Sequence, residues 1–154
     1  MTCTEAPPRV GRMALVGSWT VRSVHELSGV RHALADRLPC DCAAATADPV
    51  EDTALSGVER IVLVASELVS NALQHADGPA TVRLLCDGRS VLLEVVDRSP
   101  DVPPVVASRR PPGEGGFGLH LARRAAHTVG WYRTARDEKR VWARFTDPSP
   151  LAPR

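Results

Sequence analysis

The segment from Ile61 to Ala76 places Glu67, Asn71 and His75 four residues apart within an otherwise apolar run. On a helix, side chains at this spacing step along one side. A helical wheel puts Glu67, Asn71 and Gln74 opposite a broad apolar face, which consists of Ile61, Ala65, Leu68, Val69, Ala72 and Ala76. The pattern therefore predicts a helix with a core side and a polar side, and a solvated face is the plain interpretation of the polar side.

Capping signals give the bounds of this helix and of an earlier one. Ser56 precedes Glu59 by three positions, which is a capping box, and Gly78-Pro79 is a stop signal. A second capping box, Ser23 with Glu26, predicts a helix that runs to about Leu38 and ends before Pro39. The apolar stripe of this earlier helix consists of Leu27, Val30, Leu34 and Leu38.

Strands are predicted before, between and after these helices. The first covers 13–21, with a bulge or break at Gly17, and two more, 80–85 and 90–96, form a hairpin around Asp87-Gly88. A last hairpin joins 131–135 to 141–145 around Asp137-Glu138-Lys139. Between the hairpins, 98–116 is rich in Pro, Arg, Ser and Gly and predicts a lid, and a helix is expected from 117 or 119 to about Val129.

The order strand, helix, helix, hairpin, lid, helix, hairpin predicts an α/β (α+β) two-layer sandwich. Its sheet is mixed and mostly antiparallel, with the helices on one face. A chain of 154 residues is one domain of ordinary size. We expect this domain to cover 13–146, between disordered tails at 1–12 and 147–154.

Charge and hydropathy exclude some classes of partner. The formal net charge is +1, so nothing in the overall charge favours nucleic acid. No apolar run approaches the length that spans a membrane, and a cytoplasmic protein is expected.

Three blocks of sequence carry chemistry. The first is the helix with Glu67 and Asn71, the second is Asp97 at the end of a hydrophobic strand, and the third is the glycine cluster 113–118 in front of a helix. In this order and spacing they resemble the N-box and the two glycine boxes of the GHKL ATP-binding superfamily, which includes histidine kinases and gyrase. The amino-acid sequences of the blocks are most similar to those of the actinobacterial anti-sigma factor serine kinases. The resemblance covers the chain from about the first strand to Phe145.

The resemblance implies a Bergerat (histidine kinase-like ATPase) fold that binds ATP with Mg²⁺. It implies that Glu67 is the catalytic base, that Asn71 binds Mg²⁺ and that Asp97 accepts the exocyclic amine of adenine. Carboxylate and amide oxygens have the chemistry for these roles, although Glu67 could equally be a solvated helix carboxylate and Asp97 a turn residue.

The phosphates have candidate ligands as well. Gly115, Gly116 and Gly118 allow backbone amides to approach phosphate at a helix N-terminus. His75 could donate to a phosphate oxygen or lie on the surface. Arg109 and Arg110 could close on phosphate from the lid, or form a solvated basic pair.

The first glycine box departs from the family pattern. The family reads Asp-x-Gly-x-Gly, whereas Ser99 and Asp101 stand at the two glycine positions here. Asp101 adds bulk and negative charge near the expected nucleotide, so a binding module without phosphotransfer is an alternative. A histidine kinase fragment that is phosphorylated on His25 or His32 is another.

The partners are those that the resemblance implies. The protein would phosphorylate a serine on an anti-anti-sigma (STAS-type) protein and sequester a sigma factor, as a homodimer.

Overall fold

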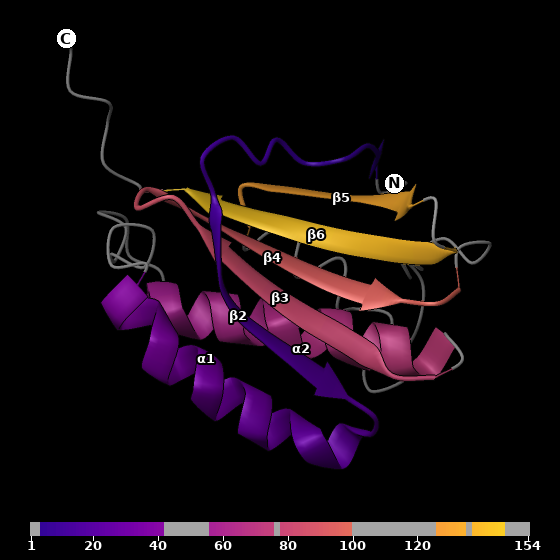
Figure 1. Ribbon diagram of the computed structural model, residues 1–154. Coiled ribbons are helices and arrows are strands. Elements are labelled where there is room, and N and C mark those ends of the chain that lie inside the picture. Colours follow the sequence, from indigo (N-terminus) through magenta and orange to yellow (C-terminus); the bar gives the residue numbers. More distant parts are fainter. Residues whose placement is uncertain (1–3, 42–55, 76–77, 100–125, 135–136, 147–154) are drawn as a thin grey trace, which may run out of the picture.

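The computed structural model describes residues 4–41, 56–75, 78–99, 126–134 and 137–146. Within these ranges, a twisted sheet forms one layer and the two long helices form a second layer on one of its faces (Figure 1). The elements in chain order are β1 (Thr4–Glu5), β2 (Ala14–Val21), η1 (Val24–Glu26), α1 (Leu27–Asp41), α2 (Gly57–His75), β3 (Ala80–Cys86), β4 (Ser90–Asp97), β5 (Thr128–Thr134) and β6 (Glu138–Thr146).

The sheet has the order β1-β5-β6-β4-β3-β2. β1 pairs with β5 in parallel, and all other neighbours are antiparallel. This arrangement confirms the prediction of a mixed, mostly antiparallel sheet with helices on one face. The main core lies between the two layers, where side chains of β3, β4 and β6 meet the apolar faces of α1 and α2.

Helix α2 begins at the predicted capping box. The Ser56 hydroxyl accepts a hydrogen bond from the Glu59 amide at 3.1 Å, and a Glu59 carboxylate oxygen accepts one from the Ser56 amide at 3.4 Å. Two backbone donors at the helix start are thus satisfied. The predicted apolar face is buried as far as Ala72, so α2 packs on the sheet in the expected orientation.

Helix α1 differs from the prediction at both ends. A 3-10 turn precedes it, the Ser23 side chain makes no capping hydrogen bond, and the Glu26 carboxylate instead accepts from the Arg22 amide at 2.7 Å. At the other end, the helix continues through Pro39 to Asp41. Proline removes one helical hydrogen bond, and the helix extends only a few residues beyond it, so the cost is confined to the last turn. The predicted apolar stripe of α1 is buried throughout.

The first long strand contains the predicted bulge. The register of β2 against β3 shifts between Leu15 and Gly17, so Val16 is the extra residue. Arg37 of α1 donates a hydrogen bond to the Val16 carbonyl, which provides a partner at the irregular position. The indole of Trp19 occupies the space where a side chain at Gly17 would lie, which explains the glycine.

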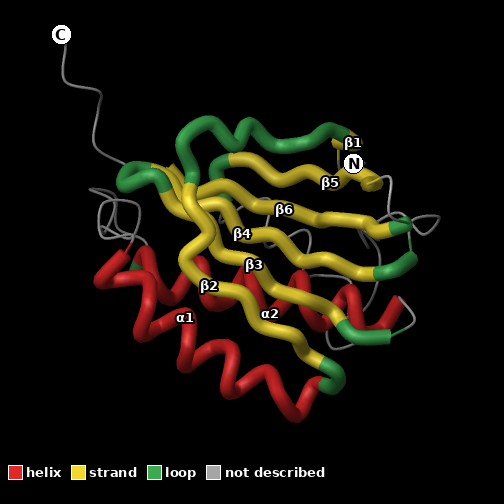
Figure 2. The backbone as a smooth tube through the Cα atoms, in the orientation of Figure 1, coloured by secondary structure: helices red, strands yellow, loops and turns green. Residues whose placement is uncertain are grey.

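Thr4–Glu5 lie within the tail that was expected to be disordered, but they are ordered in the structure. Thr4–Glu5 form β1, and the Ala6 carbonyl accepts a hydrogen bond from the Trp142 indole at 2.8 Å. Figure 2 shows the loop after β1 running from the β5 edge of the sheet back to β2. A second apolar cluster lies on the sheet face away from the helices and consists of Leu85, Leu92 and Trp142, with Met13 and Tyr132 packed against them.

The C-terminal part of the chain begins its last hairpin earlier than expected. β5 starts at Thr128, so Thr128 and Val129 belong to a strand instead of the end of the predicted helix. β6 starts at Glu138, which places Glu138 and Lys139 in the strand, and Asp137 takes the turn conformation with φ of 58°. The predicted lid, from Pro100 on, and the start of the predicted helix lie outside the described residues.

An added methyl group at Gly130 is predicted to destabilise the sheet. A Cβ at Gly130 would lie 2.5 Å from Cζ2 of Trp142, which is closer than van der Waals contact allows. We expect Gly130→Ala to lower the free energy of unfolding by about 1–3 kcal/mol, measured by urea denaturation. Gly29→Ala, where nothing lies within 4 Å, is the control and should be neutral or stabilising. Equal effects of the two variants would contradict the prediction.

Candidate functional site

One side of α2 carries buried polar atoms that lack a hydrogen-bond partner within the described part of the chain. The atoms are Asn71 Oδ1, His75 Nε2 and Arg60 Nε. Asn71 is only 8% exposed, although the sequence pattern placed this residue on the polar side of the helix. Glu67 and His75 are half-buried on the same side of α2. The predicted series Glu67, Asn71, His75 is therefore present, but it does not form a solvated face.

Buried polar atoms are nearly always hydrogen-bonded, because an unpaired one loses its bonds to water without replacement. Two such atoms, one turn apart at Asn71 and His75, indicate that this side of α2 faces something other than apolar core. An amide oxygen is a ligand for a hard cation, and an imidazole nitrogen can bind an anionic oxygen. The arrangement is suited to a cation and an anionic group side by side.

Asp97 lies at the end of β4, and its side chain is 1% exposed. Side chains alternate along a strand, so Asp97 shares the helix-facing side of β4 with Val95. Its Oδ1 accepts a hydrogen bond from the Ser99 amide at 2.9 Å. Its Oδ2 lies 3.4 Å from Nζ of Lys139, which is 2% exposed and stands directly opposite on β6.

Burial raises the pKa of the Asp97 carboxyl above its ordinary value. The hydrogen bond from Ser99 and the charge of Lys139 lower this pKa, but they offset the effect of burial only in part. Asp97 is therefore a carboxylate that is held inside the protein by two specific partners. Buried carboxylates with a perturbed pKa and a charged partner are common at ligand-binding sites. They also occur in structural ion pairs.

Asp97 is expected to make stability fall as the pH rises. Its pKa is higher in the folded protein than the ordinary 3.8, so the folded state binds the proton more tightly than the unfolded state. The contribution of Asp97 to the free energy of unfolding is then largest at low pH and decreases as the pH rises from 3.8 through the folded pKa. Urea denaturation across this window, with Asp97→Asn as reference, measures the slope. If the free energy of unfolding of the wild type minus that of Asp97→Asn increases with pH, the prediction is wrong.

The described site residues gather at one end of the molecule. The C-terminal end of α2, the end of β4 and the start of β6 all lie at this end (Figure 1). The structure thus brings Asn71 and His75 to the same end as Asp97. Gly115, Gly116 and Gly118 lie outside the described residues, as do Asp101, Arg109 and Arg110.

Lys139 is the site residue that sequence reasoning missed. It was placed in a turn, whereas it is a strand residue that forms a buried ion pair with Asp97. Its chemical type offered one signal, because it is the only lysine in the chain. Its position opposite Asp97 could be recognised only after β4 and β6 were known to be neighbours.

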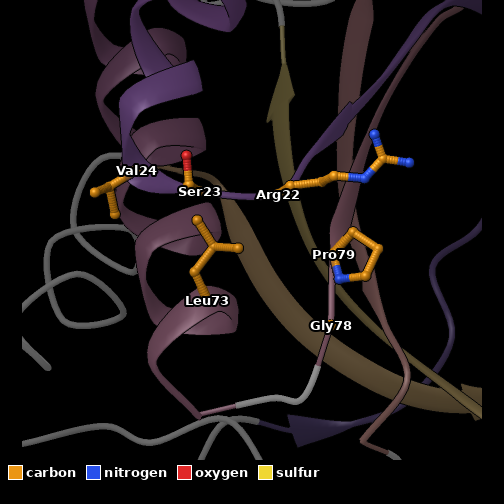
Figure 3. Close-up of a pocket in the computed structure, with 6 residues that line it drawn as sticks. All are labelled: Arg22, Ser23, Val24, Leu73, Gly78 and Pro79. Carbon is orange, nitrogen blue, oxygen red and sulfur yellow. The ribbon is translucent and has the colours of Figure 1, made fainter.

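Two hollows border the helices. One, of about 410 Å³, lies against α1 and α2, and Glu67 and Arg31 are among its described lining residues. The other, of about 450 Å³, is lined by residues from the β2–η1 junction, the end of α2 and the turn before β3, among them Arg22, Leu73 and Pro79 (Figure 3). The described linings of both hollows lack Asn71, His75 and Asp97.

Among the described residues, no group of three or more His, Cys, Asp or Glu side chains is arranged to hold a metal ion. In the same part of the chain, no helix combines the length and the apolar character that crossing a membrane requires.

The chain is similar in sequence to histidine kinase-like proteins. Residues 20–145 match the family described as the histidine kinase-like ATPase domain. The chain is 31% identical over 136 residues to the signal transduction histidine-protein kinase AfsQ2 of Streptomyces coelicolor, an alignment that covers 73% of this chain and 25% of that protein. The chain therefore spans about a quarter of the length of this relative.

A solved structure, the Acinetobacter baumannii histidine kinase AdeS, is similar with a TM-score of 0.45 and 15% identity, over 86% of this chain and 68% of that one. The family match covers most of the chain, including α2, the whole of β4 and most of β6. The chain belongs to the histidine kinase-like ATPase domain family of the GHKL superfamily.

Proposed function

We propose that this domain binds Mg·ATP at the end of the molecule where Asn71, His75 and Asp97 lie. The buried, unpartnered Oδ1 of Asn71 fits a Mg²⁺ ligand, and the buried carboxylate of Asp97 fits an acceptor for the exocyclic amine of adenine. His75 would donate to a phosphate oxygen. Gly115, Gly116 and Gly118 would supply backbone amides to the phosphates.

The proposed reaction is phosphoryl transfer to a serine hydroxyl. When bound, Mg·ATP supplies the γ-phosphoryl group and the cation offsets the charge of the phosphates. Glu67 accepts the proton of the serine hydroxyl while the serine oxygen bonds to the γ-phosphorus. At the same time, the bond between the γ-phosphorus and the oxygen that leaves with ADP breaks. Glu67 then releases this proton to solvent. Glu67 is suited to this role because it is half-buried, one helical turn before Asn71 and on the same side of α2.

The proposed acceptor is an anti-anti-sigma protein of the STAS type, with a sigma factor as the sequestered partner. This proposal rests on the resemblance of the three sequence blocks to the anti-sigma factor serine kinases. We propose that the protein acts in the cytoplasm. A homodimer is proposed because the resemblance implies one.

A second candidate function is a binding module that holds a partner without transferring phosphate. One observation favours it: Asp97 already has partners, because Ser99 donates to its Oδ1 and Lys139 lies beside its Oδ2. Ser99 also stands where the family has a glycine. In this alternative the domain keeps the fold and controls its partner by binding alone.

The single observation that carries the kinase proposal is the buried Oδ1 of Asn71, which has no hydrogen-bond partner among the described residues and lies on the side of α2 that Glu67 shares. The experiment incubates the full chain and a STAS-type protein with Mg·ATP and locates phosphate by mass spectrometry. Phosphoserine on the STAS-type protein is the expected result. Binding of the partner without transfer would favour the binding module, and acid-labile phosphate on His25 or His32 would favour a histidine kinase.

A further inference from the structure

The Asp97–Lys139 pair is the most enclosed charged pair in the described part of the chain. The two side chains are 1% and 2% exposed, and Oδ2 and Nζ lie 3.4 Å apart. The residues stand opposite each other across β4 and β6. Lys139 shares the helix-facing side of β6 with Val141, just as Asp97 shares that side of β4 with Val95. Both charges therefore point from the end of the sheet toward the helix layer.

Enclosing this pair is costly on its own account. Two charges that are removed from water recover the lost hydration only with very favourable geometry, and two apolar side chains at such positions are often at least as stable. The chain has one lysine, and it stands beside the carboxylate that the site assigns to the nucleotide base. A function in ligand reading would explain why the pair is present.

The pair presents a hydrogen-bond acceptor beside a donor. Asp97 can accept, and the Lys139 ammonium carries three donor hydrogens, so it can donate to more than one group at once. The edge of adenine has the matching order, because its exocyclic amine is a donor and the neighbouring ring nitrogen N1 is an acceptor. Guanine reverses this order, with an oxygen at position 6 and a hydrogen on N1.

We propose that Lys139 is a specificity-determining residue for the base: it donates a hydrogen bond to N1 of adenine while Asp97 accepts from the exocyclic amine. This inference rests on the proposed binding of ATP. Lys139 would be a second residue, beside Asp97, that contacts the base, and the pair would disfavour the binding of GTP. A guanine in the same position would place its oxygen against Asp97 and its N1 hydrogen against Lys139.

The test replaces the acceptor nitrogen N1 of the ligand and removes the charge of Lys139 from the protein. Calorimetric titration in Mg²⁺ compares ATP with 1-deaza-ATP, in which a CH group replaces N1. The wild type should bind 1-deaza-ATP at least about tenfold more weakly, because a hydrogen bond from a charged donor is lost. Lys139→Met should bind the two nucleotides equally.

The neighbouring residue provides a matched control. Arg140 is also a cation of β6, but it points to the opposite face of the sheet and pairs with Glu94 at 3.7 Å. Arg140→Met should keep the preference for ATP over 1-deaza-ATP. Loss of that preference in Arg140→Met as well would show that it reflects strand integrity and would overturn the assignment to Lys139.

Part of the test needs no variant. Protein labelled with ¹⁵N-lysine has a single side-chain nitrogen to observe, which is Nζ of Lys139. We expect ATP to shift its resonance and 1-deaza-ATP at saturation to shift it clearly less. If the wild type binds ATP and 1-deaza-ATP equally, the inference fails while the proposed nucleotide site stands. If neither nucleotide binds, both fail.

Discussion

Glu67→Gln should reduce the rate of phosphoserine formation by about 10²–10⁴-fold and leave the affinity for Mg·ATP almost unchanged. Glutamine keeps the size of the side chain and its hydrogen-bonding reach, but it cannot accept the proton of the serine hydroxyl. In the proposed mechanism Glu67 contacts the reacting groups and not the adenine, so the affinity for Mg·ATP should change little. Initial rates with a STAS-type partner and calorimetric titration with ATP measure the two quantities.

Glu59→Gln is the matched control for this result. Glu59 lies on the same helix, but its carboxylate caps the first turn by accepting from the Ser56 amide at 3.4 Å. Glutamine can accept the same hydrogen bond, so the control loses only the negative charge at the helix N-terminus; it should cost less than about 1 kcal/mol in stability and should keep the rate of transfer. A Glu67→Gln variant that transfers phosphate at the full rate would remove Glu67 from the mechanism.

Lys139→Met should lower the free energy of unfolding at pH 7 by about 3 kcal/mol. The substitution keeps much of the side-chain volume but leaves the Asp97 carboxylate enclosed without its ammonium partner. Because Asp97 can take up a proton, the loss should shrink as the pH falls toward the raised pKa of Asp97. Urea denaturation at several pH values measures both effects.

Two further variants separate charge from packing. Adding Asp97→Asn to Lys139→Met removes the remaining charge, so the double variant should be less destabilised than the sum of the single ones by about 1–3 kcal/mol. Glu5→Gln removes the exposed ion pair with Arg133, at 3.5 Å, and should cost less than about 1 kcal/mol. If the effects of Asp97→Asn and Lys139→Met are additive, the two side chains do not stabilise each other.

Local signals explain what could be predicted. The capping box at Ser56 and the apolar face of α2 are written in residues three and four positions apart, so the sequence indicated the start and the orientation of this helix. The turn at Asp87 is equally local, since its Oδ1 accepts from the amides of Arg89 and Ser90 at 2.9 Å and 2.7 Å. These features placed Glu67, Asn71 and Asp97 on the correct elements.

Contacts between distant residues account for what was missed. Lys139 is paired with Asp97 because β6 lies beside β4, and no local pattern around Lys139 shows this. β1 exists because two residues add to the edge of β5, which is far away in the sequence. α1 continues through Pro39 because a helix can lose one hydrogen bond in its last turn. The burial of Asn71 likewise depends on tertiary packing and not on its place in the helical pattern.

The most direct test of the nucleotide site is a calorimetric titration of the full chain with ATP, with and without Mg²⁺. Gln74→Ala is the control for Asn71→Ala, because Gln74 is an exposed residue of the same helix. We predict saturable binding that Mg²⁺ strengthens in the wild type and in Gln74→Ala, and loss of the Mg²⁺ effect in Asn71→Ala. No saturable binding at millimolar ATP, or an undiminished Mg²⁺ effect in Asn71→Ala, would contradict the assignment of this site.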